Sequence, residues 1–203
     1  MTQLKNYSKL LANRITQLVF SLAVVVTTFG PAAVHAARWQ TVNRDAEKLR
    51  EFNDHVQKYI DLEQKLERPL PSVGKTDDPA TVGAHRKALA DAIRAARREA
   101  RQGDVFGDTA ELFRHIIRQD ARERSVRDAL AAMKEVPKLS PRVNGDYPEN
   151  LPLATVPPLI LARLQPLPDS LEYRFMGRDL ILYDAKTNLI IDVVHEAVPT
   201  IRR

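Results

Sequence analysis

The chain carries near its C-terminus the stretch that decides its fold, Leu171-Glu-Tyr-Arg-Phe-Met-Gly-Arg-Asp-Leu-Ile-Leu-Tyr-Asp-Ala-Lys-Thr-Asn-Leu-Ile-Ile-Asp-Val-Val194. Apolar and charged side chains alternate at period two from Leu171 to Phe175, which is typical of a strand with one buried face. Short connections at 177–178 and 185–188 separate this strand from two further apolar runs. Because connections this short join antiparallel neighbours, the stretch predicts a three-stranded antiparallel β-meander over 171–194.

The last run of the meander is apolar on both faces, with Asp192 as its single exception. A strand of this kind is covered on both sides. We therefore expect helices on one face of the sheet and the preceding proline-rich segment on the other. A carboxylate inside such a strand needs a partner when it is buried, and Arg174 and Arg178 are the candidates for a structural ion pair with Asp192.

Residues 137–168 contain eight of the thirteen prolines of the chain. Each proline removes an amide donor and fixes φ, so this segment is neither one regular helix nor a central strand. Apolar residues recur between the prolines, Val143, Leu151 and Leu153 among them. We predict an ordered strap that lies over the core, with a short helix that starts at 155–158 and runs to about Leu164.

Helical patterns precede the strap. Apolar residues recur at intervals of three and four from Trp39 to Leu66, which predicts a long amphipathic helix. Asp78-Pro79 has the pattern of an N-cap followed by proline at the first helical position. Gly103 is typical of the position just past a helix end, so the second helix is expected to end at about Gln102.

A third helix is expected to begin after Asp108, where the aspartate and Glu111 have the spacing of a capping box. The helical part then covers 38–135. Together these elements predict an α+β fold with about three N-terminal helices, the proline-rich strap with its short helix, and the C-terminal meander. One domain, 37–203, holds them all.

The first 36 residues have the order of a secretory signal peptide. Three basic residues precede an uncharged run at 15–29, and Gly30-Pro31 follows it. Small side chains are required one and three residues before the cleavage point, and Ala36 and Val34 occupy these positions. We expect cleavage between Ala36 and Ala37, which places the mature protein in the bacterial periplasm or the extracellular medium.

The alternative for this segment is an uncleaved membrane anchor. An anchor needs roughly 20 apolar residues to cross a hydrocarbon core of about 30 Å, and the run 15–29 is shorter and contains Thr, Ser and Gln. No cysteine follows the run, which excludes a lipid-modified N-terminal cysteine. We therefore expect no transmembrane segment in the mature chain.

Composition argues against a nucleic-acid partner. The chain has a formal charge of +5, but three of its 31 Lys and Arg residues lie in the signal peptide, which has no Asp or Glu. The mature chain thus has 28 basic against 26 acidic residues, whereas phosphate binding needs a clustered surplus of cations. The absence of cysteine excludes disulfides, thiolate metal sites and thiol nucleophiles.

The predicted second helix carries the one patterned group of charges. At about 100° per residue, six cations fall within about a third of its circumference. They are Arg86, Lys87, Arg94, Arg97, Arg98 and Arg101. Such a basic stripe suits anionic lipid head groups, an acidic envelope polymer or an acidic partner. The alternative is a solvated face whose cations pair with Asp and Glu of neighbouring helices.

No catalytic or metal-binding motif stands out, and no cofactor is expected. The four histidines of the mature chain are too far apart in sequence to offer a pair of zinc ligands on one helix. No serine lies in a nucleophile elbow. The meander carboxylates Asp179, Asp184 and Asp192 remain as candidates for acid–base chemistry. The first two also suit turns, where aspartate side chains bond backbone amides.

Three stretches resemble a group of exported bacterial proteins that carry no known activity. They are Leu171 to Asp192, Thr155-Val-Pro-Pro158 and Gln102-Gly-Asp-Val-Phe106. This resemblance covers most of the mature chain and implies export and a bacterial source. Within the meander, the order Tyr-Arg-aromatic, Gly-x-Asp and Leu-Ile-x-Asp-Val is similar to the C-terminal strands of periplasmic nickel- and cobalt-homeostasis proteins. That similarity transfers no metal ligand to this chain.

The sequence favours a non-catalytic binding or accessory module of the bacterial envelope, whose partner is an envelope protein or an anionic envelope component. Two alternatives stay open. One is association with an anionic surface through the basic helix 79–102. The other is a hydrolase that uses the meander carboxylates, which requires Asp184 or Asp192 to face a concave pocket beside another titratable group with a strongly perturbed pKa.

Overall fold

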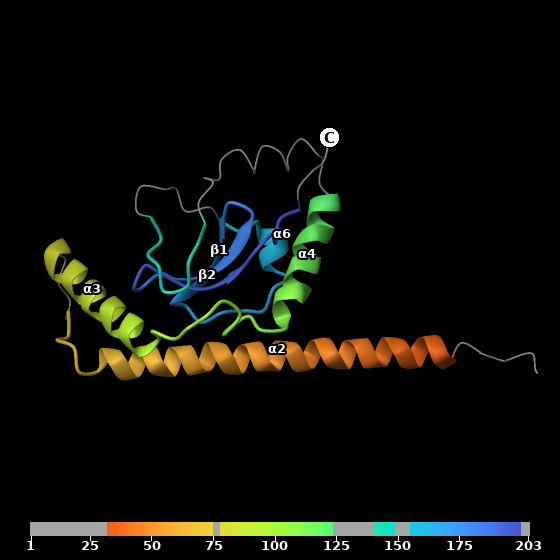
Figure 1. Ribbon diagram of the computed structural model, residues 1–203, viewed down its shortest axis with the longest axis horizontal. Helices are drawn as coiled ribbons and strands as arrows, with labels where there is room; N and C mark the ends of the chain where they lie inside the picture. Colours follow the sequence, from red (N-terminus) through yellow and green to blue (C-terminus); the bar gives the residue numbers. More distant parts are fainter. Residues whose placement is uncertain (1–31, 75–77, 124–139, 149–154, 200–203) are drawn as a thin grey trace, which may run out of the picture. The chain divides into compact units, whose positions relative to one another are not determined.

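The computed structural model describes residues 32–74, 78–123, 140–148 and 155–199 (Figure 1). The helices within these ranges are α2 (Ala32–Glu67), α3 (Pro79–Ala96), α4 (Thr109–Glu123) and α6 (Pro158–Leu161). The strands are β1 (Leu171–Met176), β2 (Asp179–Asp184) and β3 (Leu189–Val194). The fold is α+β, as predicted. No described helix combines the length and the apolar character that a membrane span requires.

The chain divides into two units, Met1–Val42 and Asn43–Arg203. The first contributes only the start of α2 to the described ranges. That helix begins at Ala32, earlier than the pattern starting at Trp39 predicted. The signal peptide stays a prediction, because residues 1–31 lie outside the description. Its predicted cleavage point, between Ala36 and Ala37, falls within α2 and stays a prediction as well. Residues 124–135 of the predicted helical part lie outside it as well.

The strands are antiparallel neighbours in the order β1-β2-β3, which confirms the meander. The pairing of β2 with β3 contains one irregularity, because Leu182 pairs with Asp192 whereas Tyr183 pairs with Ile190. Ile191 is therefore the extra residue of a β-bulge. The bulge shifts the alternation of β3 and leaves Asp192 opposite Leu182, which belongs to the helix-side core.

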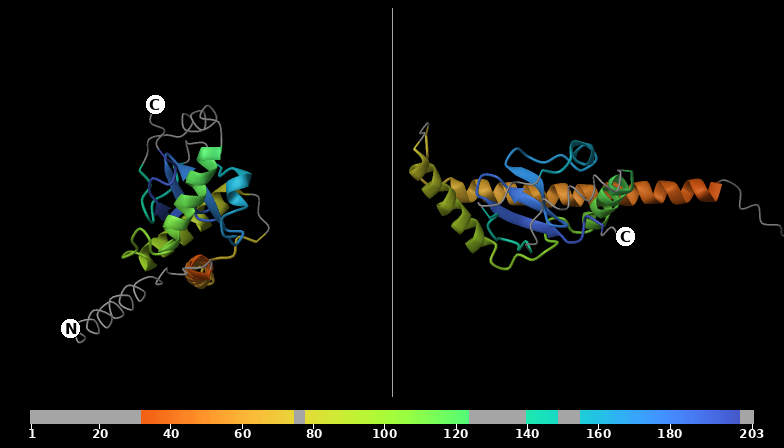
Figure 2. Two further views of the ribbon diagram at one scale, coloured as in Figure 1. Left: turned by 90° about the vertical axis from the view of Figure 1, so that its right-hand side faces the viewer. Right: turned by 90° about the horizontal axis from the view of Figure 1, so that it is seen from above.

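Helices cover one face of the sheet. Seen from above in Figure 2, the strands lie across the C-terminal part of α2. Buried side chains of α2, α3 and α4 join those of the sheet in one cluster, with Val56, Leu89, Ile93, Ile117, Leu180 and Leu182 among them. Four aromatic rings at its centre have centroids 5.4–6.5 Å apart; they belong to Phe52, Phe106, Phe113 and Tyr173. Edge-to-face and stacked contacts of this kind add to the burial of apolar area.

The strap contributes to both faces of the sheet. Tyr147 packs on the face opposite the helices, against Ile181, Tyr183 and Ile190, as expected. The later part of the strap instead joins the helix-side core through Val156, Ile160 and Leu164. The assignment of the whole strap to one face was therefore wrong. Its predicted short helix is confirmed as α6.

The strap also covers the outer edge of β3. Asn144 donates its backbone N–H to the carbonyl of Ile190 at 2.8 Å, and Ile190 donates to the carbonyl of Gly145 at 2.8 Å. Tyr147 donates to the carbonyl of Asn188 at 2.9 Å. These three bonds satisfy backbone groups that an edge strand otherwise exposes.

Helix α3 ends at Ala96, so the predicted end at Gln102 is wrong. Asp78 caps its start, as predicted. At the other end Arg97 leaves the helical conformation, with φ −107° and ψ 26°. Its carbonyl oxygen accepts a hydrogen bond at 2.7 Å from the side-chain amide of Asn144 in the strap. The same oxygen accepts the backbone N–H of Ala100 at 2.9 Å, so a local turn and a side chain distant in sequence together replace the bond of a continuing helix.

Candidate functional site

Asp192 organises the segment between α3 and α4. Its side chain is fully buried. Its carboxylate oxygens accept four hydrogen bonds at 2.7–2.8 Å, from the backbone N–H groups of Gly103, Val105, Phe106 and Val193. The predicted ion pair with Arg174 or Arg178 is therefore wrong. Charge-assisted bonds from backbone N–H groups are strong, so Asp192 has a structural role.

Asp184 is the second fully buried carboxylate of the meander. The Tyr59 hydroxyl of α2 donates to it at 2.5 Å. In the turn after β2, the backbone N–H groups of Lys186 and Thr187 donate to it at 2.8 and 3.2 Å. The turn role expected for Asp184 is confirmed. Burial and the neighbouring Asp184 carboxylate raise the pKa of Tyr59 far above its ordinary value.

A chain of ion pairs joins the C-terminal end of α2 to the turn between β2 and β3. Glu63 is only 3% exposed, and its carboxylate accepts a hydrogen bond at 3.0 Å from Lys186 Nζ. The same ammonium donates to Glu67 at 2.5 Å, and Glu67 lies 3.4 Å from His85 Nε2. Burial raises the pKa of Glu63 in spite of Lys186. The hydrogen bond from Lys186 lowers the pKa of Glu67.

We expect the protein to lose stability steeply above pH 10. Burial raises the pKa of Tyr59 and of Tyr173, so the unfolded chain loses these phenolic protons near pH 10 while the folded chain keeps them. The two phenols therefore leave stability unchanged below pH 10. Above it, each lowers the free energy of unfolding by about 1.4 kcal/mol per pH unit.

Lys186 adds to this loss of stability at high pH. Partial burial lowers the pKa of its ammonium, but hydrogen bonds to Glu67 and Glu63 raise it by more. Urea unfolding followed by circular dichroism between pH 8 and about pH 11.5 measures the slope. Tyr59→Phe and Tyr173→Phe should each reduce the slope above pH 10 by up to about 1.4 kcal/mol per pH unit, which is the contribution of one proton. A slope that neither substitution changes contradicts the prediction.

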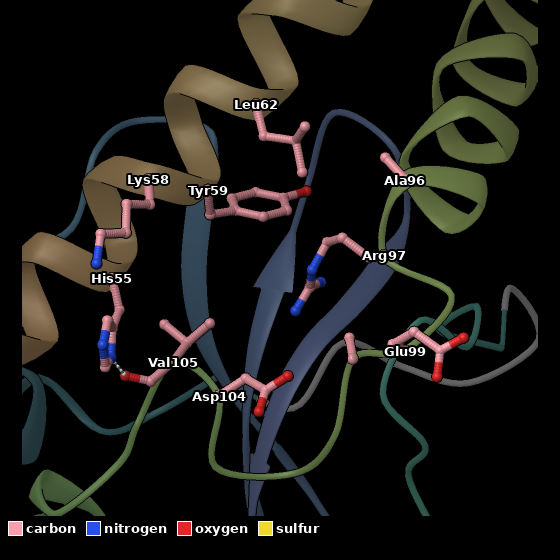
Figure 3. Close-up of a pocket in the computed structure, with 10 residues that line it drawn as sticks. His55, Lys58, Tyr59, Leu62, Ala96, Arg97, Glu99, Asp104 and Val105 are labelled. Atoms are coloured by element: carbon pink, nitrogen blue, oxygen red, sulfur yellow. Dashed lines mark hydrogen bonds between the residues drawn. The ribbon is translucent and has the colours of Figure 1, made fainter.

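A cleft of about 330 Å³ lies between α2 and the segment that follows α3 (Figure 3). Charged side chains of both signs line it, namely Lys58, Arg97, Glu99 and Asp104. The guanidinium of Arg97 lies over the ring of Tyr59, with its central carbon 5.3 Å from the ring centroid. It donates to the carbonyl of Ile191 at 3.0 Å and to the side-chain oxygen of Asn144 at 3.1 Å.

Three cations of the predicted basic stripe, Arg86, Lys87 and Arg94, line a pocket of about 580 Å³ beside the strap. Two carboxylates, Asp91 and Asp146, line the same pocket. Lys87 and Arg94 both pair with Asp91, and Arg94 also pairs with Asp146. Nearby acids therefore neutralise much of this charge, which matches the alternative of a paired, solvated face.

The other three cations of the stripe do not join this pocket. Arg97 lines the cleft instead and is half-buried. Arg98 and Arg101 lie beyond the end of α3, so helical spacing no longer places them on its face. Arg98 lies 3.4 Å from Glu99. The expectation of one continuous stripe over 79–102 is thus wrong, because it assumed a helix that continues past Ala96.

A groove of about 690 Å³ runs along β1 and α6. Its lining is mainly apolar and includes Val156, Leu161, Leu164, Leu167, Leu171 and Tyr173. Leu159 and Leu161 of α6 are 71% and 48% exposed. Among the described residues from Asn43 onwards, Val82 is the one other large apolar residue that is exposed. The Nε atom of Arg174 in the groove lining is buried and has no hydrogen-bond partner in the described part of the chain.

Neither the groove nor the cleft was predicted. For the groove, the sequence does hold a signal at 159–161. Three consecutive apolar residues on one helical turn cannot all face the core, so exposed leucines follow once this segment is assigned to a helix. For the cleft no such pattern exists, because Lys58 and Asp104 belong to separate elements and share no periodicity.

The histidines occupy separate places. His55 Nδ1 donates to the carbonyl of Val105 at 3.2 Å. His195 Nδ1 lies 2.9 Å from Asp179, which also accepts the N–H of Glu196. Within the ranges that the structure describes, no three side chains are grouped as metal ligands.

Comparison of the chain with protein-family models, curated proteins and solved structures found no match. The resemblances to exported bacterial proteins and to the nickel- and cobalt-homeostasis proteins are therefore untested. The geometry of the groove and of the cleft is what remains to support a function.

Proposed function

We propose that the protein is a non-catalytic binding module of the bacterial envelope that holds an extended, apolar segment of a partner protein in the groove beside β1. The contrast between the two edges of the sheet carries this proposal. The strap covers the edge of β3 with three backbone hydrogen bonds. Beside β1, the described residues form one isolated bridge, between Thr155 and Arg174. An edge strand that forms few backbone bonds with the described residues is a template for a further strand.

The side chains around the groove define the chemistry of the bound segment. In strand addition, backbone bonds supply affinity, and pockets for alternate side chains supply specificity. The apolar lining therefore selects apolar side chains, and the exposed Leu159 and Leu161 add apolar area of the kind that marks interaction sites.

The alternative functions have less support. A hydrolase needs an accessible carboxylate, but Asp184 and Asp192 are fully buried, and both bond to backbone N–H groups. Association with an anionic surface needs a cationic face, but the cations of α3 are divided and largely paired. Export is part of the proposal and rests on the order of residues 1–36.

Selection of displayed random peptides against the purified protein tests the groove. We expect the selected peptides to be apolar at alternate positions. Leu161→Asp should weaken their binding by about tenfold or more, because it places a carboxylate in the apolar lining. Val82→Asp is the matched control, since Val82 is equally exposed but lies on α3, outside the groove lining. It should leave the affinity unchanged.

Both substituted residues are exposed, so each variant should stay within about 0.5 kcal/mol of the parent in stability. Two outcomes contradict the proposal. One is a selection that returns no peptide whose affinity depends on Leu161. The other is a homodimer, measured by sedimentation, that Leu161→Asp dissociates, because a second copy would then be the occupant of the groove.

A further inference from the structure

The cleft of Figure 3 shares no lining residue with the groove and presents a different chemistry. Lys58, Arg97 and Asp104 line it, and none of the three forms an ion pair with another described residue. Opposite charges on one wall normally pair directly, and each such pair then offers little to a ligand. Here a cationic and an anionic side chain border the same cavity without such a pair.

Hydrogen bonds to the protein hold two of these side chains, Arg97 and Asp104. The guanidinium of Arg97 donates hydrogen bonds to the carbonyl of Ile191 and to the side-chain oxygen of Asn144. The Asp104 carboxylate accepts the backbone N–H of Arg101 at 2.8 Å. Figure 3 shows Arg97 between Tyr59 and Asp104. A guanidinium has five N–H groups, and Arg97 uses two of them in these bonds, so donors remain for a ligand.

We propose that this cleft binds a small zwitterion, whose carboxylate lies against Arg97 and whose ammonium group lies against Asp104, with Lys58 adding positive charge to the same cleft. A free α-amino acid and a short peptide both have this chemistry. The cleft volume of about 330 Å³ is at the small end of ligand pockets, which matches such molecules. Tyr59, Leu62 and Val105 supply an apolar part of the wall for a side chain.

Desolvation supports this assignment. Burial lowers the pKa of Arg97, and the nearby charges of Tyr59, Asp192 and Asp104 offset this only in part. A guanidinium keeps its charge, so the cation has lost part of its water without forming a direct ion pair with a described residue. A bound carboxylate restores that interaction as a charge-assisted hydrogen bond. A ligand with only one charge leaves the opposite charge of the cleft without a partner, and the cleft therefore discriminates against simple ions.

Isothermal titration calorimetry on the purified protein tests this site with four probes. L-alanine and alanyl-alanine carry both charges, whereas acetate and ethylammonium carry one each. We expect at least one zwitterion to bind about tenfold or more tightly than either ion. The ranking of the two zwitterions then distinguishes a site for free amino acids from a site for peptides.

Three variants locate the binding. Asp104→Asn removes an anionic charge of the lining and keeps an oxygen for the N–H of Arg101, and Lys58→Gln removes the exposed cation. Each substitution should lower the affinity for the zwitterion by about fivefold or more. Lys65→Gln changes an exposed lysine on the same helix outside the cleft lining and should have no effect. Arg97 is left intact because it also joins the end of α3 to β3.

Two results overturn the proposal. One is the absence of binding by both zwitterions, and the other is acetate binding as tight as theirs, which would make the cleft a plain anion site. Leu161→Asp should bind the zwitterion like the parent, since Leu161 is not part of the cleft lining. The two proposals can therefore fail independently: a negative result for peptide binding in the groove does not affect the zwitterion site in the cleft, and a negative result in the cleft does not affect the groove.

Discussion

Replacement of Asp192 by asparagine should lower the free energy of unfolding by about 3–5 kcal/mol. The carboxylate is fully buried and accepts four backbone N–H groups. An amide of the same size turns one acceptor into a donor that faces other donors, so buried N–H groups lose their partner. Domains of this size are stable by only about 5–15 kcal/mol, and the loss is therefore a large part of the total.

Urea unfolding at pH 7 measures this cost, and hydrogen exchange locates it. The N–H groups of Gly103, Val105 and Phe106 should be protected in the parent protein and exchange faster in the variant. Asp104→Asn is the matched control, because Asp104 is exposed in the same segment and accepts one backbone bond. It should cost less than about 1 kcal/mol. Equal costs for the two variants would exclude the proposed role of Asp192.

Replacement of Lys186 by methionine should cost about 2–3 kcal/mol at pH 7. Methionine keeps much of the side-chain volume but leaves the carboxylate of Glu63, which is 3% exposed, without its cation. The value is set below the usual range for a broken buried pair because the Lys186 side chain is 38% exposed, so water replaces part of the contact. Loss of the more exposed pair with Glu67 adds little.

The penalty for Lys186→Met should shrink as the pH falls from 7 towards 4.5. Burial raises the pKa of Glu63, and loss of the cation raises it further. The folded variant therefore takes up this proton at a higher pH than the unfolded chain, and protonation removes the buried charge. At neutral pH, the same substitution made together with Glu63→Gln should cost less than about 1 kcal/mol. A penalty of equal size with and without Glu63 would show that the pair is not coupled.

The sequence predicted the meander because its evidence is local. A period-two pattern and turns of two to four residues fix strand, partner and direction within 171–194. The start of α3 was predictable for the same reason, since Asp78 acts on N–H groups two and three residues away. The end of α3 was not, because one of the two hydrogen bonds to the carbonyl of Arg97 comes from Asn144, 47 positions along the chain.

The candidate sites follow the same division. The basic stripe was read from helical spacing, and it failed where the helix stopped at Ala96. The groove depends on which edge of the sheet the strap covers, and both edges have the same kind of backbone groups. The cleft depends on Arg97 and Asp104, which line the same cavity and which separate hydrogen bonds hold in place. None of these three features can be predicted from the spacing of neighbouring residues.

The sequence by itself determined the elements, their order and the antiparallel sheet, because those depend on hydrophobic period, capping and turn length over a few residues. Only the tertiary structure decided where the buried charges found partners. Asp192 is bound by backbone N–H groups and not by an arginine. Every residue except proline carries the same N–H donor, so no pattern of side chains marks which loop will supply it. Which loop supplies the N–H donors to Asp192 is decided by tertiary packing alone.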